Sequence, residues 1–230
     1  MKKIAILQSN YIPWKGYFDL INNVDEFIFY DEVQYTKNDW RNRNKIVTKQ
    51  GIQWLTIPVR QEKFSQLIKD TKVSDIRWRK KHWSAIQQNY SKSKYFKEYK
   101  DIFEELYMGC DEEYLSKINY KFIATINDIL GITTKIRCSS EFELVEGQTE
   151  KLISICKDCN ADIYISGPAA KDYFDEELAK KQNIKVEWMD YSGYKEHRQL
   201  SSVFEHGVSI LDLIFNEGIN ARKFMNSFGD

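Results

Sequence analysis

Residues 3–45 decide the fold, and they read KIAILQSNYIPWKGYFDLINNVDEFIFYDEVQYTKNDWRNRNK. Ile4–Leu7 is a short apolar run, long enough for a buried strand, and a polar, proline-containing loop follows it at Gln8–Lys15. Gly16–Ile21 then favours a helix, and Phe27–Tyr30 is a second apolar run. A strand, a loop, a helix and a strand in this order make a βαβ unit, which requires a parallel sheet.

A parallel sheet also predicts where a ligand binds, because α/β sheets hold their ligands outside the carboxyl ends of the strands. Two segments leave predicted strands at that edge, Gln8–Gly16 and Asp31–Lys45. We therefore expect a functional site that contains both loops.

The rest of the chain continues the α/β pattern after an interruption. Gln53–Val59 predicts a third strand, and residues 74–130 have the hydrophobic period of three successive helices. The later elements are expected as strands at Thr134–Cys138, Asp162–Ser166 and Lys185–Met189, and helices at Thr149–Cys159, Ala170–Gln182 and Val208–Phe215. The sequence thus predicts a single domain over residues 1–230, a three-layer α/β fold with a parallel, Rossmann-like sheet and a helical insert.

The helical insert has start and stop signals of its own. We expect its first helix to begin after Ser74, with Ile76 on the buried stripe. The second should end near Gly109, and the third should be capped by Asp111 and stop at Gly131.

Composition limits the function classes. The 34 basic and 34 acidic residues cancel, which argues against a general nucleic-acid binder. Four cysteines are too few and too unevenly spaced for a disulfide scaffold. Cys156 and Cys159 form one C-x-x-C pair, but zinc needs four ligands and no second pair is present, so no metal site is expected. The apolar run near the N-terminus is shorter than a signal-peptide core, and no segment has the length of a membrane span. A cytoplasmic protein is expected.

The first candidate site is the loop after the first strand. A strand-to-helix loop offers free backbone N–H groups and the positive end of the helix dipole, which suit a phosphate or a carboxylate. The residues that could contribute are Gln8, Pro13, Trp14, Lys15, Gly16 and Tyr17. Only one glycine is present, so neither a Walker loop nor a G-x-G-x-x-G fingerprint applies. The alternative is that the aromatic residues belong to the core.

The second candidate site follows the second predicted strand. Asp31 comes directly after this strand, where a carboxylate can reach a ribose hydroxyl, a metal or an amine. In an extended segment Arg41 and Arg43 share one side, and two guanidinium groups on one face could clamp a phosphate or a carboxylate. The candidate ligand-binding residues here are Gln34, Trp40, Arg41, Asn42 and Arg43. The alternative is a solvated loop with local ion pairs.

His82 is the third candidate. It lies in a run of basic residues, but it is four residues before Ile86 and so borders the buried side of the predicted helix. It could be a general base or a phosphate ligand. A hydrogen-bonded structural histidine is the alternative.

The fourth candidate is a second loop from a strand to a helix. Ser166 and Gly167 end a predicted strand, and Lys171 and Asp172 follow in the next predicted helix. A phosphate could bind here for the same physical reason as at the first loop. Serine and glycine are also ordinary turn residues.

Several of these segments resemble one known family. They are QSNYIPWKGYFDLI, FIFYDEVQYTKNDWRNRN, QWLTIPV, His82 with Tyr90, YISGPAAKDYF and SILDLIFNEG, in that order along the chain. Together they resemble the WbqC-like protein family over nearly the whole sequence. The resemblance implies a role in bacterial O-antigen or other surface-polysaccharide biosynthesis. The family usually has a Pro-x-Tyr-x-Gln element near the C-terminus, whereas this chain has Ser192–Leu200 there, SGYKEHRQL.

A more distant similarity is to nucleotidylyltransferases and pantothenate synthetase-type ligases of the HUP-like α/β class. Those enzymes have a proline and a His-x-Gly-His motif after the first strand, and this chain has Pro13 followed by Trp14–Tyr17. Ser166 and Gly167 with Lys171 are similar to their second phosphate loop. The similarity implies a scaffold that can hold a nucleotide, but the two catalytic histidines are missing.

Three functions follow as hypotheses. The first is acyl or aminoacyl transfer that forms an amide on a nucleotide-linked amino sugar. In this hypothesis the basic residues hold phosphates, Trp14 or Trp40 stacks on a ring, and Asp31 or His82 accepts the amine proton. The second is an ATP-dependent nucleotidylyltransferase or ligase, with magnesium, and the third is a noncatalytic sugar-nucleotide-binding protein. A nucleotide or nucleotide-linked sugar is the expected partner, and no cofactor other than ATP with magnesium or an acyl donor is implied.

Overall fold

A parallel five-stranded sheet forms the centre of the molecule, with the strand order β7-β2-β1-β8-β9. The computed structural model describes residues 1–229. The strands are β1 (Lys3–Leu7), β2 (Glu26–Phe29), β7 (Lys135–Cys138), β8 (Ile163–Ser166) and β9 (Lys185–Trp188). The predicted α/β class and parallel sheet are confirmed.

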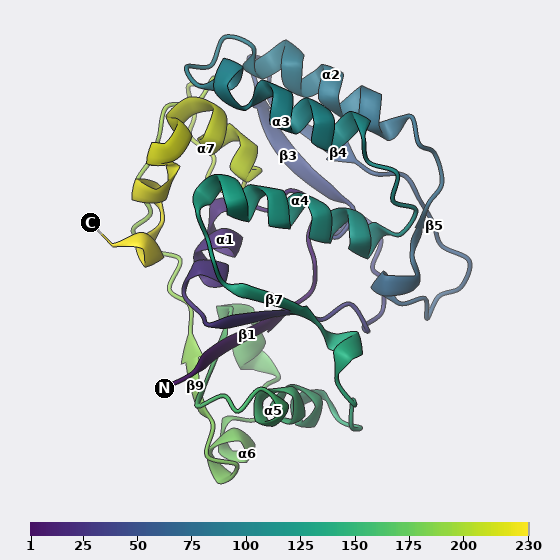
Figure 1. The fold of residues 1–230 in the computed structure, drawn as a ribbon, viewed down its shortest axis with the longest axis vertical. Coiled ribbons are helices and arrows are strands. Elements are labelled where there is room, and N and C mark those ends of the chain that lie inside the picture. Colours follow the sequence, from purple (N-terminus) through teal and green to yellow (C-terminus); the bar gives the residue numbers. More distant parts are fainter. Residues whose placement is uncertain (230) are drawn as a thin grey trace.

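Helices cover both faces of this sheet and make three layers (Figure 1). One face carries α1 (Lys15–Asn22) and α4 (Leu115–Leu130), and the other carries α5 (Gln148–Asp158) and α6 (Glu176–Lys181). Side chains of β1 alternate between the two layers, because Ala5 belongs to the core on the α1 side while Ile4 and Ile6 belong to the core on the α5 side.

The strand order places a topological switch point between β1 and β8. From β1 the chain moves to β2 and β7 on one side, whereas β8 and β9 lie on the other side. Connections therefore diverge at the carboxyl ends of β1 and β8, where α/β sheets commonly bind ligands.

The helical insert consists of α2 (Trp78–Tyr90), α3 (Phe96–Met108) and α4. Figure 1 shows α2 and α3 beyond α4, on the side of α4 that faces away from the sheet. The helices α3 and α4 end at Gly109 and Gly131 as predicted, and Gly131 has the left-handed φ of 63° that favours glycine at this position.

Two predicted starts in the insert are wrong. The first helix begins at Trp78, and Ile76 is 59% exposed, because Asp75 Oδ1 accepts a hydrogen bond from the Arg77 N–H and holds a turn there. Asp111 does not cap α4, whose N-cap is Tyr114. The chain just before α4 is occupied in backbone pairing, with the Val73 N–H bonded to the Glu113 carbonyl.

The predicted strand at Gln53–Val59 is divided between two small antiparallel sheets outside the central sheet. A hairpin joins β3 (Arg43–Thr48) to β4 (Gly51–Thr56), and β5 (Val59–Arg60) pairs with β6 (Lys72–Val73). The break falls at Ile57 and Pro58, where the Ile57 N–H turns to the Asn42 carbonyl, 2.7 Å away, and proline has no N–H for a ladder.

The predicted helix at Ala170–Gln182 is also divided. Pro168–Asp172 is a 3-10 helix, and α6 begins only after Asp175, whose side chain accepts a hydrogen bond from the Leu178 N–H at 2.9 Å. The extended backbone of this N-cap residue interrupts the helix.

The remaining elements are α7 (Ile210–Glu217) and four further 3-10 helices, at Ile68–Asp70, Ser139–Glu141, Gly218–Phe224 and Asn226–Phe228. Among residues 1–229, no helix combines the length and the apolar character that crossing a membrane would require.

Candidate functional site

The loop after β1 has a strained backbone that the β3–β4 hairpin holds in place. Ile12 is fully buried and has a φ of 37°, a value that β-branched residues rarely adopt. Asn44 of β3 donates hydrogen bonds to the carbonyls of Tyr11 and Ile12, both at 3.0 Å, and the Tyr11 N–H bonds to the Trp40 carbonyl. Such strain persists only where the surroundings fix the conformation, and it is frequent at functional sites.

A pocket of about 290 Å³ opens beside this loop. Three segments far apart in the sequence build it: the loop after β1, the start of the hairpin, and the chain before α7. The lining residues are Asn10, Pro13, Trp14, Trp40, Asn44 and Gly207. The structure thus brings Pro13, Trp14 and Trp40, three of the predicted site residues, to one cavity, which we name the Trp14–Trp40 pocket.

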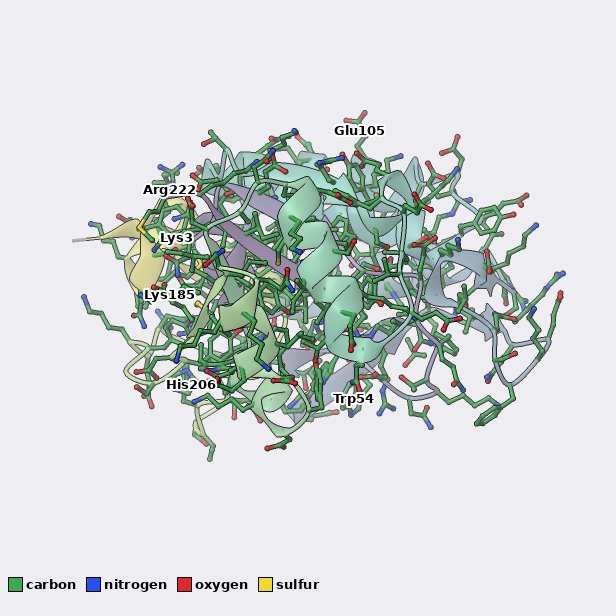
Figure 2. All side chains as sticks on the ribbon, turned by 90° about the horizontal axis from the view of Figure 1, so that it is seen from below. Lys3, Trp54, Glu105, Lys185, His206 and Arg222 are labelled. Carbon is green, nitrogen blue, oxygen red and sulfur yellow. The ribbon has the colours of Figure 1, made fainter. Side chains whose placement is uncertain are left out.

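An aromatic and cationic surface adjoins the pocket. The rings of Trp40 and Trp54 lie 5.5 Å apart and are 39% and 43% exposed, and Figure 2 shows Trp54 at the periphery of the molecule. The Arg43 guanidinium lies 4.2 Å from the centre of the Trp54 ring, and the Lys45 ammonium lies within 6 Å of both rings. We name these four side chains the tryptophan platform.

Residues 41 and 42 form a turn and the strand begins only at Arg43, so the segment is extended only in part; burial alternates along it, but the side chains have separate partners. Arg41 and Arg43 are half-buried, whereas Asn42 and Asn44 are buried. The Arg41 guanidinium donates to Asn10 Oδ1, and that of Arg43 covers Trp54, so the two do not form one clamp. Asn42 donates to the Ile57 carbonyl at 2.8 Å, which is a structural contact.

Lys15 is buried at the start of α1, next to Trp14. Its ammonium donates to the Lys195 carbonyl at 2.9 Å and lies 5.0 Å from the centre of the Tyr194 ring. Burial lowers the pKa of Lys15 to about 8, against the opposing effect of Asp19. A lysine with such a pKa is partly neutral near physiological pH and could accept a proton.

The other predicted residues of the first loop have packing roles. A Cβ atom at Gly16 would lie 2.3 Å from the Trp14 indole, so only glycine leaves room for this ring. Tyr17 is buried and donates to the Gln8 carbonyl at 2.9 Å.

Asp31 lies at the carboxyl end of β2, and it lines a second cavity instead of the Trp14–Trp40 pocket. Its carboxylate accepts hydrogen bonds from the N–H and the hydroxyl of Ser9, at 2.8 and 2.7 Å. Burial raises the pKa of Asp31, while the two Ser9 hydrogen bonds oppose this effect. Gln34 donates to the Phe64 carbonyl and lines a separate hollow on the surface.

His82 is buried inside the insert and has partners at both ring nitrogens. Nδ1 lies 2.9 Å from the Tyr11 hydroxyl, and Nε2 lies 3.2 Å from the Thr56 carbonyl. Burial lowers the pKa of His82 to about 4, so the ring is neutral at pH 7. This geometry is that of a structural histidine.

The second predicted phosphate loop does not reach the Trp14–Trp40 pocket. Ser166 is buried with its hydroxyl 3.2 Å from that of Tyr164, whose ring packs in the core on the α5 side. Lys171 and Asp172 are exposed, and the Lys171 ammonium lies 5.7 Å from the centre of the Trp188 ring. Gly167 precedes a 3-10 helix of five residues, so no α-helix dipole begins there.

Sequence reasoning missed the buried network between the C-terminal segment and the N-terminal half. His197 Nε2 lies 2.7 Å from Asp212 Oδ2, and Asp212 also accepts hydrogen bonds from Tyr90 and Gln199. Tyr194 donates to Asp19 at 2.5 Å. One signal was available, because Asp212 is a lone acid in the apolar run SILDLIF.

Comparison of the chain with known proteins identifies its family. Residues 8–224 match the WbqC-like protein family. The chain is similar to the uncharacterized protein Rv1507c of Mycobacterium tuberculosis, with 47% identity over 226 residues that cover 98% of each chain. No solved structure matches the chain. The match over almost the full length shows that the chain belongs to the WbqC-like protein family.

Proposed function

We propose that the protein is a cytoplasmic enzyme of surface-polysaccharide biosynthesis that transfers an acyl or aminoacyl group to a nucleotide-linked amino sugar. The family resemblance implies the pathway, and the Trp14–Trp40 pocket with the adjoining tryptophan platform supports the substrate class. Sugar rings and bases both stack on aromatic faces, and the cations beside them suit phosphates.

The pocket has room for only one part of such a ligand. About 290 Å³ is at the small end for ligand sites and suits one ring. The amino sugar would occupy this pocket between Trp14 and Trp40. The diphosphate and the base would then extend over the platform, where Arg43 supplies positive charge and Lys45 lies 3.5 Å from Glu205, a partner that a phosphate would replace.

Amide formation requires a base in the site. The amine nitrogen attacks the acyl carbon and a C–N bond forms. The bond to the donor's leaving group breaks, that group departs with the electron pair, and a base accepts the amine proton. In this proposal Lys15, whose pKa burial lowers to about 8, replaces Asp31 and His82 as the base. It follows Trp14 in the chain but is not among the residues that line the pocket, so its amine would have to leave the Lys195 carbonyl to accept the proton.

The test begins with binding. Uridine-diphosphate-linked amino sugars are titrated into the wild-type protein and into Trp40→Ala. Loss of a stacking contact worth about 1–3 kcal/mol should weaken binding by roughly 5- to 150-fold. Phe64→Ala, which removes another exposed aromatic ring on a different surface, is the matched control. If Trp40→Ala and the wild type bind the sugar nucleotide with equal affinity, the sugar nucleotide does not bind in this pocket.

The reaction is tested by mass spectrometry of the sugar after incubation with acyl-coenzyme A or aminoacyl donors. A mass gain that equals the acyl group supports the transferase. Binding without a mass gain supports a noncatalytic binding protein, and release of AMP or pyrophosphate from ATP supports a ligase.

A further inference from the structure

A second, larger cavity lies at the carboxyl ends of β2 and β7, along one side of α4. Its volume is about 780 Å³, which is enough for a nucleotide, and it shares no lining residue with the Trp14–Trp40 pocket. Phe29 and Asp31 line it from β2, Cys138 and Ser139 from β7, and Tyr120 and Thr125 from α4. We name it the α4 cleft, and we propose that it binds a ribonucleoside monophosphate.

Asp31 is the group that would recognise the ribose. A carboxylate after the second strand of a Rossmann-like sheet is suitably placed to accept hydrogen bonds from ribose hydroxyls. Each Asp31 oxygen accepts one hydrogen bond from Ser9, which fixes the carboxylate. A carboxylate has about four acceptor sites, so acceptor capacity remains for a ligand.

Tyr120 offers an aromatic face for the base. Its side chain is 43% exposed and its ring lies 5.7 Å from that of Phe29, which packs behind it. An exposed ring supported by a buried one is a preformed stacking surface, and stacking accepts any base.

The start of α4 suits the phosphate. Ser116 and Lys117 of its first turn line the cleft, and no side chain caps this end of the 16-residue helix. The positive end of the helix dipole attracts an anion, and Lys121 adds charge one turn later.

The charges of the cleft limit the ligand to few phosphates. The acids are Asp31, Glu32, Glu112 and Asp128, against the lysines Lys69, Lys117 and Lys121. Lys69 is already paired with Glu32 at 2.6 Å. The acids outnumber the lysines by four to three, which disfavours a triphosphate, and a single phosphate would depend on the start of α4 with Lys117 and Lys121.

Calorimetric titration of the whole protein tests the inference, with AMP, UMP, 2′-deoxy-AMP and ATP as probes. AMP should bind, ATP should bind more weakly, and the affinity for 2′-deoxy-AMP should be lower than that for AMP by about tenfold or more, because it lacks a hydrogen bond to a charged acceptor. Tyr120→Ala should weaken AMP binding by about 5- to 150-fold. Comparison of the affinities for AMP and UMP shows whether the cleft distinguishes between bases.

Three variants complete the test. Tyr173→Ala removes another exposed tyrosine and should leave AMP affinity unchanged. Trp40→Ala should also leave it unchanged, which separates this inference from the proposed function. Asp31→Asn should abolish the preference for AMP over the 2′-deoxy compound. If this variant does not fold, the wild-type comparison and Tyr120→Ala still decide. Absence of AMP binding, or equal affinity in Tyr120→Ala, overturns the inference.

Discussion

His82 illustrates how burial sets the protonation of a single residue. The pKa of its ring is about 4 in the folded protein, compared with about 6.5 for a free histidine, so the unfolded chain binds a proton first as the pH falls. The contribution of this pKa difference to the free energy of unfolding is fully present above pH 6.5, and it is lost as the pH falls from 6.5 through 4. At about 1.4 kcal/mol per pH unit, the loss amounts to roughly 3 kcal/mol.

We expect the free energy of unfolding of His82→Gln to depend less on pH between 4 and 6.5 than that of the wild type. Free energies of unfolding from urea titrations between pH 4 and pH 7 measure the slope. His206→Gln is the comparison: burial and the nearby Lys15 lower the pKa of this exposed histidine too, so its replacement should reduce the slope, but less than His82→Gln does. The same pH dependence in His82→Gln and the wild type would show that other groups cause the acid sensitivity.

At the scale of the element, the β3–β4 hairpin holds the strained loop after β1. Asn44→Ala removes two hydrogen bonds to the buried Tyr11 and Ile12 carbonyls and one acceptor for the Lys45 N–H. We expect a loss of about 2–3 kcal/mol in the free energy of unfolding, measured by chemical denaturation. Ligand affinity at the Trp14–Trp40 pocket should fall as well, because Asn44 lines it.

Asn42→Ala provides the matched comparison on the same strand. Asn42 is also buried, but it makes one hydrogen bond, to the Ile57 carbonyl, and its Oδ1 has no partner. Its replacement should cost about 1 kcal/mol. A loss as large as that of Asn44→Ala would contradict the role given to the strained loop.

At the scale of the whole molecule, one core joins the insert to the sheet. A single cluster of buried side chains contains Ala5 of β1, Phe18 of α1, Ile86 of α2, Phe122 of α4 and Phe215 of α7. Separation of residues 74–130 from the sheet would expose this core. We therefore predict that the chain unfolds as a single domain.

Scanning calorimetry tests this prediction. One transition with equal calorimetric and van't Hoff enthalpies is expected, and the isolated 74–130 fragment should lack helical ellipticity of native magnitude. Two resolved transitions would show that the insert is a separate folding unit.

Local sequence patterns were sufficient to predict the βαβ unit, the parallel sheet and the ends of α3 and α4. These features depend on neighbours in the chain: the apolar runs Ile4–Leu7 and Phe27–Tyr30, and glycines where a helix must stop. The positions of Pro13 and Trp14 after β1 were predictable for the same reason, and their role in a site stays a prediction.

Which side chains contact one another could be known only from the three-dimensional fold. Ser166 lies with the α5 layer because it shares a strand side with Tyr164, and the hydrogen bond between them fixes it there. His197 meets Asp212 only because the chain before α7 folds back over the loop after β1. Such contacts join residues through space, and hydrogen-bonding partners are separated by up to 208 positions along the chain, so no local pattern encodes them.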